Sequence, residues 1–158
     1  MRKIKKKYKT PKKMWSKERI EVEKILVNSF GLKKKREIWR AQTLLRKYRR
    51  LARGLAAKKD KKMEKELIEK LSRFGILEKS AGLDDVLGLT VEDILNRRLQ
   101  AVVCKLGLAK TPKQSRQLIV HGRVRIGDKR TVYPSYLVPK DMEKEIKVLI
   151  EKKEQASA

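Results

Sequence analysis

The sequence predicts an α+β fold that is predominantly helical, with an N-terminal helical body followed by a small module of two helices and a β-hairpin or short sheet. Apolar residues recur every three or four positions over most of the first two thirds of the chain, and this spacing is typical of amphipathic helices. After Gly122 the apolar period changes to two, which is typical of strands. A length of 158 residues leaves room for one compact unit or two very small ones.

Changes in charge and composition divide the chain into four predicted segments. These are a basic extension at 1–15, a helical body at 16–96, a compact module at 97–152 and a flexible tail at 153–158. The extension carries Lys at nearly every other position, with Pro11 and no apolar period. Such a segment cannot bury itself, so we expect it to order only on a partner.

The first two helices of the body follow from apolar spacing. Ser16 is the expected N-cap of the first helix and Gly31 its end. Its apolar stripe is Val22, Ile25, Leu26 and Phe30. The second helix is predicted over 35–58. Its apolar side comprises Ile38, Ala41, Leu44, Leu45, Tyr48, Leu51, Ala52 and Leu55.

The other side of this second predicted helix is strongly basic. It carries Arg36, Arg40, Arg46, Lys47, Arg49, Arg50 and Arg53. We take Arg36, Arg40, Lys47 and Arg50 as candidate nucleic-acid contacts. Trp39 falls within the basic half, where its ring could stack on a base or pack against another part of the protein. The sequence leaves both roles for Trp39 open.

The rest of the body is predicted to be structural. A third helix is marked by Met63, Leu67, Leu71 and Phe74, with Gly75 at its C′ position. Gly82 and Gly88 then bracket a loop with Asp84 and Asp85. These two acids lack nearby His or further carboxylates, so we expect them to cap a helix or to face solvent, with no metal site.

Two helices are predicted at the start of the module. Thr90 and Asp93 form a capping-box pattern that opens one helix, which Gly107 closes. Its buried stripe is Ile94, Leu95, Leu99, Val102, Val103 and Leu106. Thr111, Pro112 and Gln114 satisfy the capping rules for a short second helix. That helix is expected to stop at His121 and Gly122.

Strands follow in the last part of the module. Val124 and Ile126 alternate with arginines, Gly127 and Asp128 supply a tight turn, and the chain is expected to return over 131–133. A further strand is predicted from the alternation of Ile146, Val148 and Ile150, against a terminal helix as the alternative.

The charge distribution predicts a polyanionic partner. The formal net charge is +25, and self-repulsion of that size is best relieved by a polyanion. Residues 1–60 hold 23 bases and 5 acids, whereas 61–96 hold 6 and 8. Residues 97–130 hold 10 bases and only one acid, and 131–158 balance at 5 and 5. Two cationic surfaces are therefore expected on either side of a nearly neutral region.

Several classes of protein and site are not expected. The longest uncharged apolar runs are far shorter than the ~20 residues of a membrane span, so we expect a soluble intracellular protein with no membrane partner. The single cysteine, Cys104, excludes an internal disulfide or a Cys-rich zinc cluster. We expect neither a metal nor another cofactor, and no catalytic residues, because no nucleophile or carboxylate accompanies the only histidine, His121.

The predicted module repeats cationic side chains on a small rigid frame. These side chains are Arg98, Lys105, Lys113, Arg116, Arg123 and Arg125. Arginine offers paired donors to phosphates and base edges, and Gln117 can contact a base or a 2′-hydroxyl. The combination favours RNA or DNA binding over a merely solvated basic face.

Three segments of the sequence resemble the archaeal members of the family of small-subunit ribosomal protein four. RRLQAVVCKLGLAKTPKQSRQLIVHGRVRIGDKRTVYPSYLV resembles that family's namesake RNA-binding module. KERIEVEKILVNSFGLKKKREIWRAQTLLRKYRRLARGL and LDDVLGLTVEDILNRRLQ resemble the rest of the protein. By this resemblance the RNA-facing residues are Arg97, Arg98, Lys113, Gln114, Arg116, Gln117, His121, Arg123 and Arg125. For His121, a cap or a carbonyl partner is an equal alternative.

The resemblance also implies partners. The expected ones are small-subunit (16S) rRNA, at a multi-helix junction of its 5′ domain, and the neighbouring ribosomal proteins numbered three and five. The family also lies near the channel through which mRNA enters, in the cytoplasmic ribosome. Two other classes remain open: an RNA-modifying enzyme such as a pseudouridine synthase, which would need a catalytic domain, and a DNA-compacting basic protein.

Overall fold

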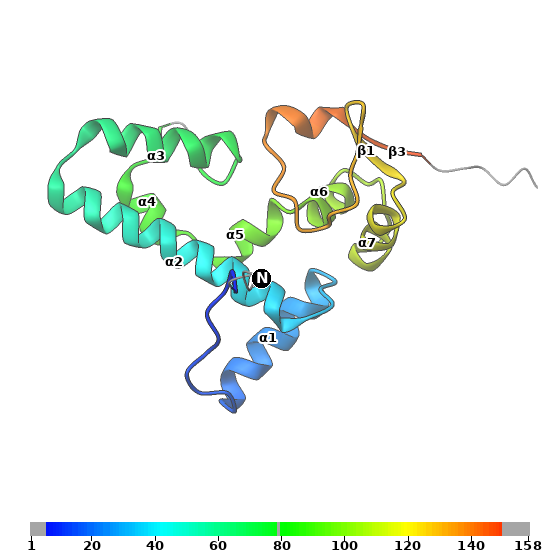
Figure 1. Cartoon of the computed structure of the whole chain (residues 1–158), viewed down its shortest axis with the longest axis horizontal. Helices are drawn as coiled ribbons and strands as arrows, with labels where there is room; N and C mark the ends of the chain where they lie inside the picture. The colour runs from blue at the N-terminus through cyan, green and yellow to red at the C-terminus, as the bar shows by residue number, and fades with distance from the viewer. Residues whose placement is uncertain (1–5, 79, 150–158) are drawn as a thin grey trace, which may run out of the picture.

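The computed structural model describes residues 6–78 and 80–149 of the chain. Within these ranges the predicted α+β fold class is confirmed. The structure contains seven α-helices and one small three-stranded antiparallel sheet (Figure 1). Figure 1 shows a helical body on one side and the module with the sheet on the other. No helix in the described part of the chain has the length and apolarity to cross a membrane.

Helix α2 (Lys35–Lys58) is the spine of the body, and its observed bounds are the predicted ones. It buries Ile38, Ala41, Leu45, Tyr48 and Ala52 on one face. Helix α3 (Lys61–Arg73) runs back beside it, while α4 (Leu83–Gly88) and α5 (Val91–Asn96) pack against the same spine (Figure 1). Leu51, predicted on the apolar side, is exposed, because it lies at the edge of the buried face.

Helix α1 (Lys17–Ser29) forms where predicted, but it buries a different face. Leu26 and Glu23 are buried, whereas Val22 and Ile25 from the predicted stripe are exposed. The buried carboxylate of Glu23 accepts hydrogen bonds from Arg19 at 2.8 Å and from the Trp39 Nε1 at 2.9 Å. The hydrogen bonds of Glu23 therefore determine which face of α1 is buried.

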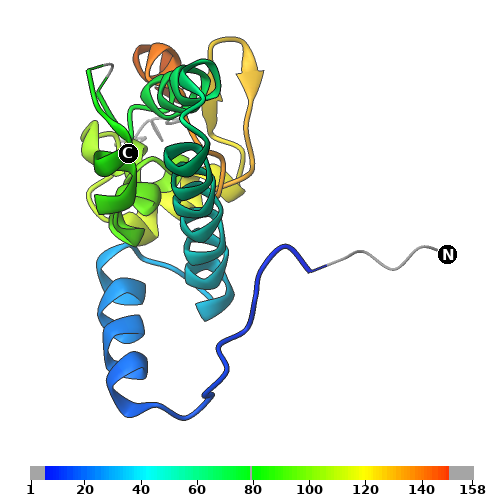
Figure 2. The same ribbon diagram turned by 90° about the vertical axis from the view of Figure 1, so that its left-hand side faces the viewer.

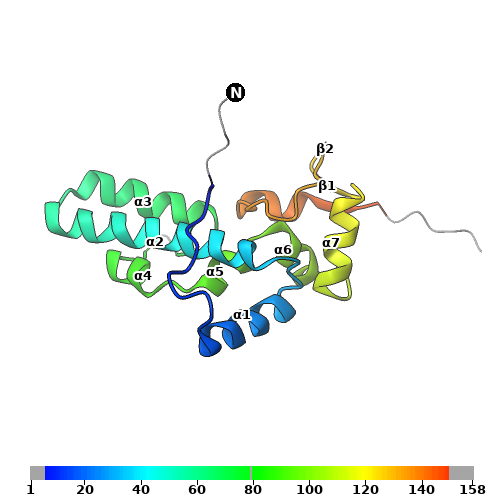
Figure 3. The same ribbon diagram turned by 60° about the horizontal axis from the view of Figure 1, so that its bottom comes forward.

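The basic extension leads from the start of α1 across the N-terminal part of α2 (Figures 2 and 3). Residues 6–16 have no helix or strand, yet the ring of Tyr8 lies 5.9 Å from that of Trp39. The Lys9 amide donates to Thr43 Oγ1 at 3.2 Å. Tyr8 and Lys9 of the extension therefore contact α2. That the extension at 1–15 orders only on a partner stays a prediction.

The end of the body combines one confirmed prediction with one correction. Gly75 has a φ of +63° after α3, as its predicted C′ position requires. The predicted loop between Gly82 and Gly88 is instead the short helix α4, which buries Val86. Asp85 caps this helix by accepting from the Gly82 amide at 2.8 Å, so its predicted capping role is confirmed.

The single helix predicted from Thr90 to Gly107 is two helices, α5 and α6 (Leu99–Lys105). The capping box of Thr90 and Gly107 at φ +72° both match the prediction. Between the helices, Arg98 is extended and bridges to Leu137. Residues 136–138 form backbone hydrogen bonds on both sides of this bridge. Leu99 N donates to Tyr136 O at 2.7 Å, and Val138 N donates to Arg97 O at 3.0 Å. These non-local bonds break the helix.

Helix α7 (Pro112–Val120) begins and ends as predicted, with His121 as its C-cap residue. The Thr111 side chain accepts from the Gln114 amide at 3.2 Å. The Gln114 side chain accepts from the Lys110 amide at 2.8 Å, one residue before the N-cap. Gly122 follows at φ +70° and turns the chain into the sheet.

The sheet has the strand order β2-β1-β3 and is antiparallel throughout. Strands β1 (Val124–Ile126) and β2 (Lys129–Arg130) form the predicted hairpin, but the return strand lies before the predicted 131–133. The tight turn places Lys129 directly opposite Ile126, so pairing starts at once. Strand β3 (Ile146–Val148) follows the 3₁₀ helix η1 (Asp141–Glu145), and the strand alternative is confirmed. Ile150 and the predicted tail at 153–158 lie outside the described residues.

Two apolar clusters fill the structure. The body cluster extends from Leu26 to Leu95 and is centred on α2. The module cluster comprises Leu99, Val102, Val103, Ala109, Ile119, Val124, Val138 and Ile146. Leu106, predicted in the buried stripe, is exposed at the end of α6. Each half therefore has its own core. Leu137 of the module packs against the body cluster, so apolar as well as polar contacts join the halves.

Candidate nucleic-acid interface

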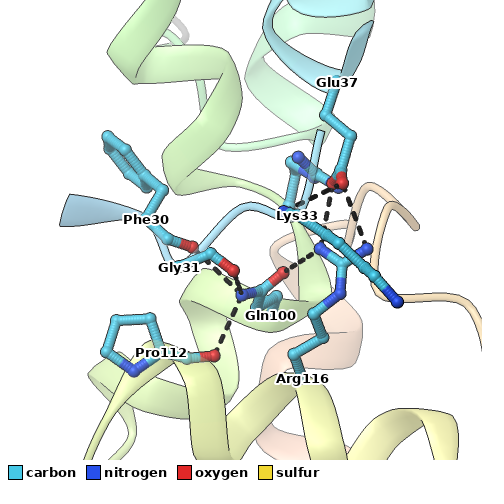
Figure 4. Close-up of polar contacts among 8 residues, drawn as sticks. Phe30, Gly31, Lys33, Glu37, Gln100, Pro112 and Arg116 are labelled. Carbon is cyan, nitrogen blue, oxygen red and sulfur yellow. Dashed lines mark hydrogen bonds and ion pairs between the residues drawn. The ribbon is translucent and has the colours of Figure 1, made fainter. Parts of the chain in front are cut away.

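Gln100 joins the body to the module through a buried amide (Figure 4). The two hydrogens of its Nε2 are shared among the carbonyls of Phe30 at 3.0 Å, Gly31 at 2.9 Å and Pro112 at 2.9 Å. The backbones are also close here, because a Cβ on Gly31 would lie 2.9 Å from the Cβ of Pro112. Gly31 has a φ of +58°, so glycine meets both requirements at this position.

Glu37 binds two arginines of the module side, Arg98 and Arg116, and Figure 4 shows Arg116 between Glu37 and Gln100. Arg98 donates to one carboxylate oxygen at 2.6 Å, and Arg116 donates to both oxygens at 3.1 Å. Burial alone would raise the pKa of Glu37, but hydrogen bonds from Arg116 and Arg98 and their charges outweigh it. The pKa is lowered from 4.5 to about 2. Glu37 is therefore a carboxylate at neutral pH.

Three arginines predicted to face RNA are thus engaged within the protein. The Arg98 side chain is only 7% exposed and that of Arg116 is 23% exposed. Arg97 pairs with Glu143 at 3.1 Å and donates to the Val138 carbonyl at 3.0 Å. One sequence signal pointed to this arrangement: Glu37 is the only acid between Glu23 and Asp60, within the most basic part of the chain.

The other predicted residues of the module are exposed. They are Lys105, Lys113, Gln114, Gln117, His121, Arg123 and Arg125. A hollow of about 240 Å³ lies between α7 and β1, lined by Gln114, Gln117, Leu118, His121 and Arg123. Amide, imidazole and guanidinium groups around an apolar floor are suited to a base or ribose with a phosphate beside it. We call this the α7–β1 hollow.

A second cationic surface follows α2. Its predicted contacts, Arg36, Arg40, Lys47 and Arg50, are all exposed. At ~100° per residue they fall within one narrow face of the helix, which we call the α2 stripe. At its N-terminal end a groove of about 400 Å³ leads to the module. The groove is lined by Lys33, Lys34, Arg36, Glu37, Arg40, Arg98, Arg116, Pro134 and Ser135.

Trp39 takes the packing role of its two possible roles. Its ring is half-buried, lies against Tyr8 and donates its Nε1 hydrogen to Glu23. At His121, the backbone carbonyl accepts from Arg130 at 3.2 Å, while the residue itself is exposed beside the hollow. Among residues 6–78 and 80–149, no three His, Cys, Asp or Glu side chains cluster as metal ligands would.

Two family models together match nearly the whole chain. Residues 2–96 match the ribosomal protein S4/S9 N-terminal domain, and residues 97–144 match the S4 domain. The chain is similar to three archaeal proteins named small ribosomal subunit protein uS4. The protein from Methanothermobacter thermautotrophicus is 46% identical over 92% of this chain and 86% of its own length.

The other two relatives give the same result. The protein from Picrophilus torridus is 49% identical over 89% of this chain and 80% of its own length. The protein from Sulfurisphaera tokodaii is 48% identical over 87% of this chain and 80% of its own length. The similarity therefore extends across both the body and the module.

Proposed function

Because the chain belongs to the family of small ribosomal subunit protein uS4, we propose that it binds small-subunit (16S) rRNA directly as a structural constituent of the subunit. Its place of action is the cytoplasmic ribosome. Its role is structural, so the alternative of an RNA-modifying enzyme is wrong. The observation that carries the proposal is the α7–β1 hollow, with its convergent amide, imidazole and guanidinium groups on a small rigid frame.

The two cationic surfaces have different tasks in this proposal. The α7–β1 hollow, which Arg123 lines, and the exposed Arg125 of β1 provide directional donors that discriminate one folded RNA from others. The α2 stripe provides phosphate contacts, which add affinity without discrimination. Arg98 and Arg116 act indirectly, because their guanidinium groups bind Glu37 and so hold the module against the body. Arg97 pairs with Glu143 within the module.

The finer assignment is that the RNA site is a multi-helix junction in the 5′ domain, and that binding nucleates assembly of the subunit body. A junction supports this assignment because two cationic surfaces on differently oriented elements can grip two RNA helices at once. The proposed neighbours are the small-subunit ribosomal proteins numbered three and five. The mRNA, close to the channel through which it enters the ribosome, is a further proposed neighbour.

The proposed function predicts that Arg123→Gln weakens binding to the folded 5′ domain of 16S rRNA about tenfold, since one directional contact contributes ~1–3 kcal/mol. Filter binding or fluorescence anisotropy at several salt concentrations measures the effect. Lys65→Gln is the matched control, because this exposed residue of α3 lies in the nearly neutral segment and its change in charge is the same.

The outcome separates RNA recognition from general DNA compaction. A DNA-compacting protein would bind duplex DNA and folded rRNA equally at a given salt concentration, and Arg123→Gln and Lys65→Gln would then behave alike. That result would contradict the proposal. A preference for the 5′ domain that persists at high salt, and that Arg123→Gln reduces, supports it.

Gly54 provides a separate test of the α2 stripe. It lies inside the helix on the same face as Arg36, and nothing lies within 4 Å of a Cβ added there. The chain itself therefore gives no reason for glycine, which costs ~1 kcal/mol relative to alanine in a helix. We expect Gly54→Ala to raise the free energy of unfolding by about 0.5–1 kcal/mol and to weaken RNA binding, since glycine allows a phosphate backbone close to the helix.

Urea unfolding and RNA titration of the same variant measure the two effects. Ala56→Gly, on the opposite face of α2, is the control and should lower stability with no change in RNA affinity. If Gly54→Ala is more stable and binds RNA as well as the original chain, RNA does not approach the stripe at Gly54.

A further inference from the structure

Trp15 is the most exposed of the large apolar side chains in the described part of the chain, at 90%. It lies in the turn directly before α1. Aromatics are only 5% of the residues, and a buried tryptophan contributes more apolar area than any other side chain. A fold with so few aromatic residues nevertheless leaves this one in solvent, so its ring is available to a partner.

The turn that carries Trp15 is held by Arg19, a half-buried residue of α1. Arg19 donates to the carbonyls of Lys13 at 3.0 Å and Met14 at 2.8 Å. The same guanidinium pairs at 2.8 Å with Glu23, which is 1% exposed. The backbone directly before Trp15 is therefore anchored to the buried face of α1, and the exposed ring extends from a fixed support.

The charges around Trp15 favour RNA over protein. Lys12, Lys13 and Lys17 flank it in sequence, and residues 1–17 contain no acid. Lysines beside an exposed aromatic ring are the elements of single-strand recognition, in which phosphates meet the cations and a base stacks on the ring. A protein-docking site would instead favour fewer charges around its apolar centre.

We propose that Trp15 is a stacking platform for an unpaired base of the bound RNA. This inference rests on the proposed function, because it requires an RNA partner, but it adds a contact outside both the α7–β1 hollow and the α2 stripe. Stacking on the ring, with the phosphates on either side near Lys13 and Lys17, would anchor a single-stranded segment beside α1. Arg19 holds the backbone that carries the ring before RNA arrives, which lowers the entropy cost of ordering this turn on binding.

The test uses the full chain and the folded 5′ domain of 16S rRNA. Trp15→Ala is expected to weaken binding about tenfold, because the variant removes the ring on which a base stacks. Trp15→Phe should retain most of the affinity, because a phenyl ring also stacks. Met14→Ala, a 55% exposed neighbour in the same turn, is the matched control and should bind like the original chain.

Fluorescence gives a second readout that a purely structural role would not change. The chain contains two tryptophans, so emission that RNA quenches in the original chain but not in Trp15→Phe belongs to Trp15. Unchanged affinity of Trp15→Ala alongside weaker binding of Arg123→Gln would overturn the stacking proposal and leave the proposed function standing. Loss of assembly with neighbouring ribosomal proteins at unchanged RNA affinity would assign Trp15 to a protein contact, and this also overturns it. If the original chain shows no preference for the rRNA, the proposed function itself fails.

Discussion

Glu37→Gln is expected to lower the free energy of unfolding by about 3–4 kcal/mol, the scale of breaking a buried ion pair. The variant leaves the guanidinium of Arg98, 7% exposed, without a carboxylate partner, and it weakens the paired hydrogen bonds from Arg116. Urea unfolding at neutral pH, followed by circular dichroism, measures the loss. Glu66→Gln on α3 is the control for the change in charge, because Glu66 is exposed.

The same ion pairs predict how stability depends on pH. The pKa of Glu37 is lowered from 4.5 to about 2 in the folded protein, so its contribution is fully present above pH 4.5. It is lost as the pH falls from 4.5 toward 2, because the carboxylate must then be protonated. The difference in pKa corresponds to about 3 kcal/mol. Between pH 4.5 and 2, the original chain should therefore lose more stability than Glu37→Gln, and parallel curves would contradict the assignment.

Gln100→Leu is expected to lower the free energy of unfolding by about 2–3 kcal/mol, because the two amide hydrogens that three carbonyls share are lost, at ~1 kcal/mol or more per hydrogen bond. Three carbonyls depend on this amide, those of Phe30, Gly31 and Pro112. Leucine has a similar size, so lost hydrogen bonding dominates over a cavity. The measurement is again urea unfolding, together with hydrogen exchange of the amides in α7.

The control for this second change is Gln117→Leu. Gln117 is an exposed amide of α7, so its replacement should leave the free energy of unfolding unchanged and instead weaken RNA binding at the α7–β1 hollow. Equal unfolding midpoints for Gln100→Leu and the original chain would show that the junction between body and module does not depend on this amide.

The sequence predicts a helix boundary correctly where residues close in the chain determine it, and fails where a distant segment does. The bounds of α2 and α7 agree with the predictions, because apolar period, the Thr111 cap and the terminal glycine are signals within a few residues. The break between α5 and α6 was missed. Its cause is the bridge from Arg98 to Leu137, and no local signal at Arg97 or Arg98 announces that partner.

The candidate interface shows the same division. The alternation of residues predicted Arg123 and Arg125 on the outer side of the first strand, and helical spacing predicted Gln117 on the polar side of the short helix. Gln114 was named by the family resemblance. These side chains are exposed, and Gln114, Gln117 and Arg123 line one hollow. Spacing also selected Arg98 and Arg116, yet their partner Glu37 is 61 and 79 residues away in the chain, beyond the reach of periodicity.

The sequence by itself determined the helical body, the compact module and the two cationic surfaces, because hydrophobic period, capping residues and net charge act locally or over a whole segment. Only the tertiary structure decided which cationic side chains face solvent and which form ion pairs between the body and the module. It also decided that α1 buries the face that carries Glu23 and leaves Val22 exposed. The physical reason is that these buried ion pairs and hydrogen bonds join groups from distant parts of the chain. Burial then determines how much each pair contributes to stability.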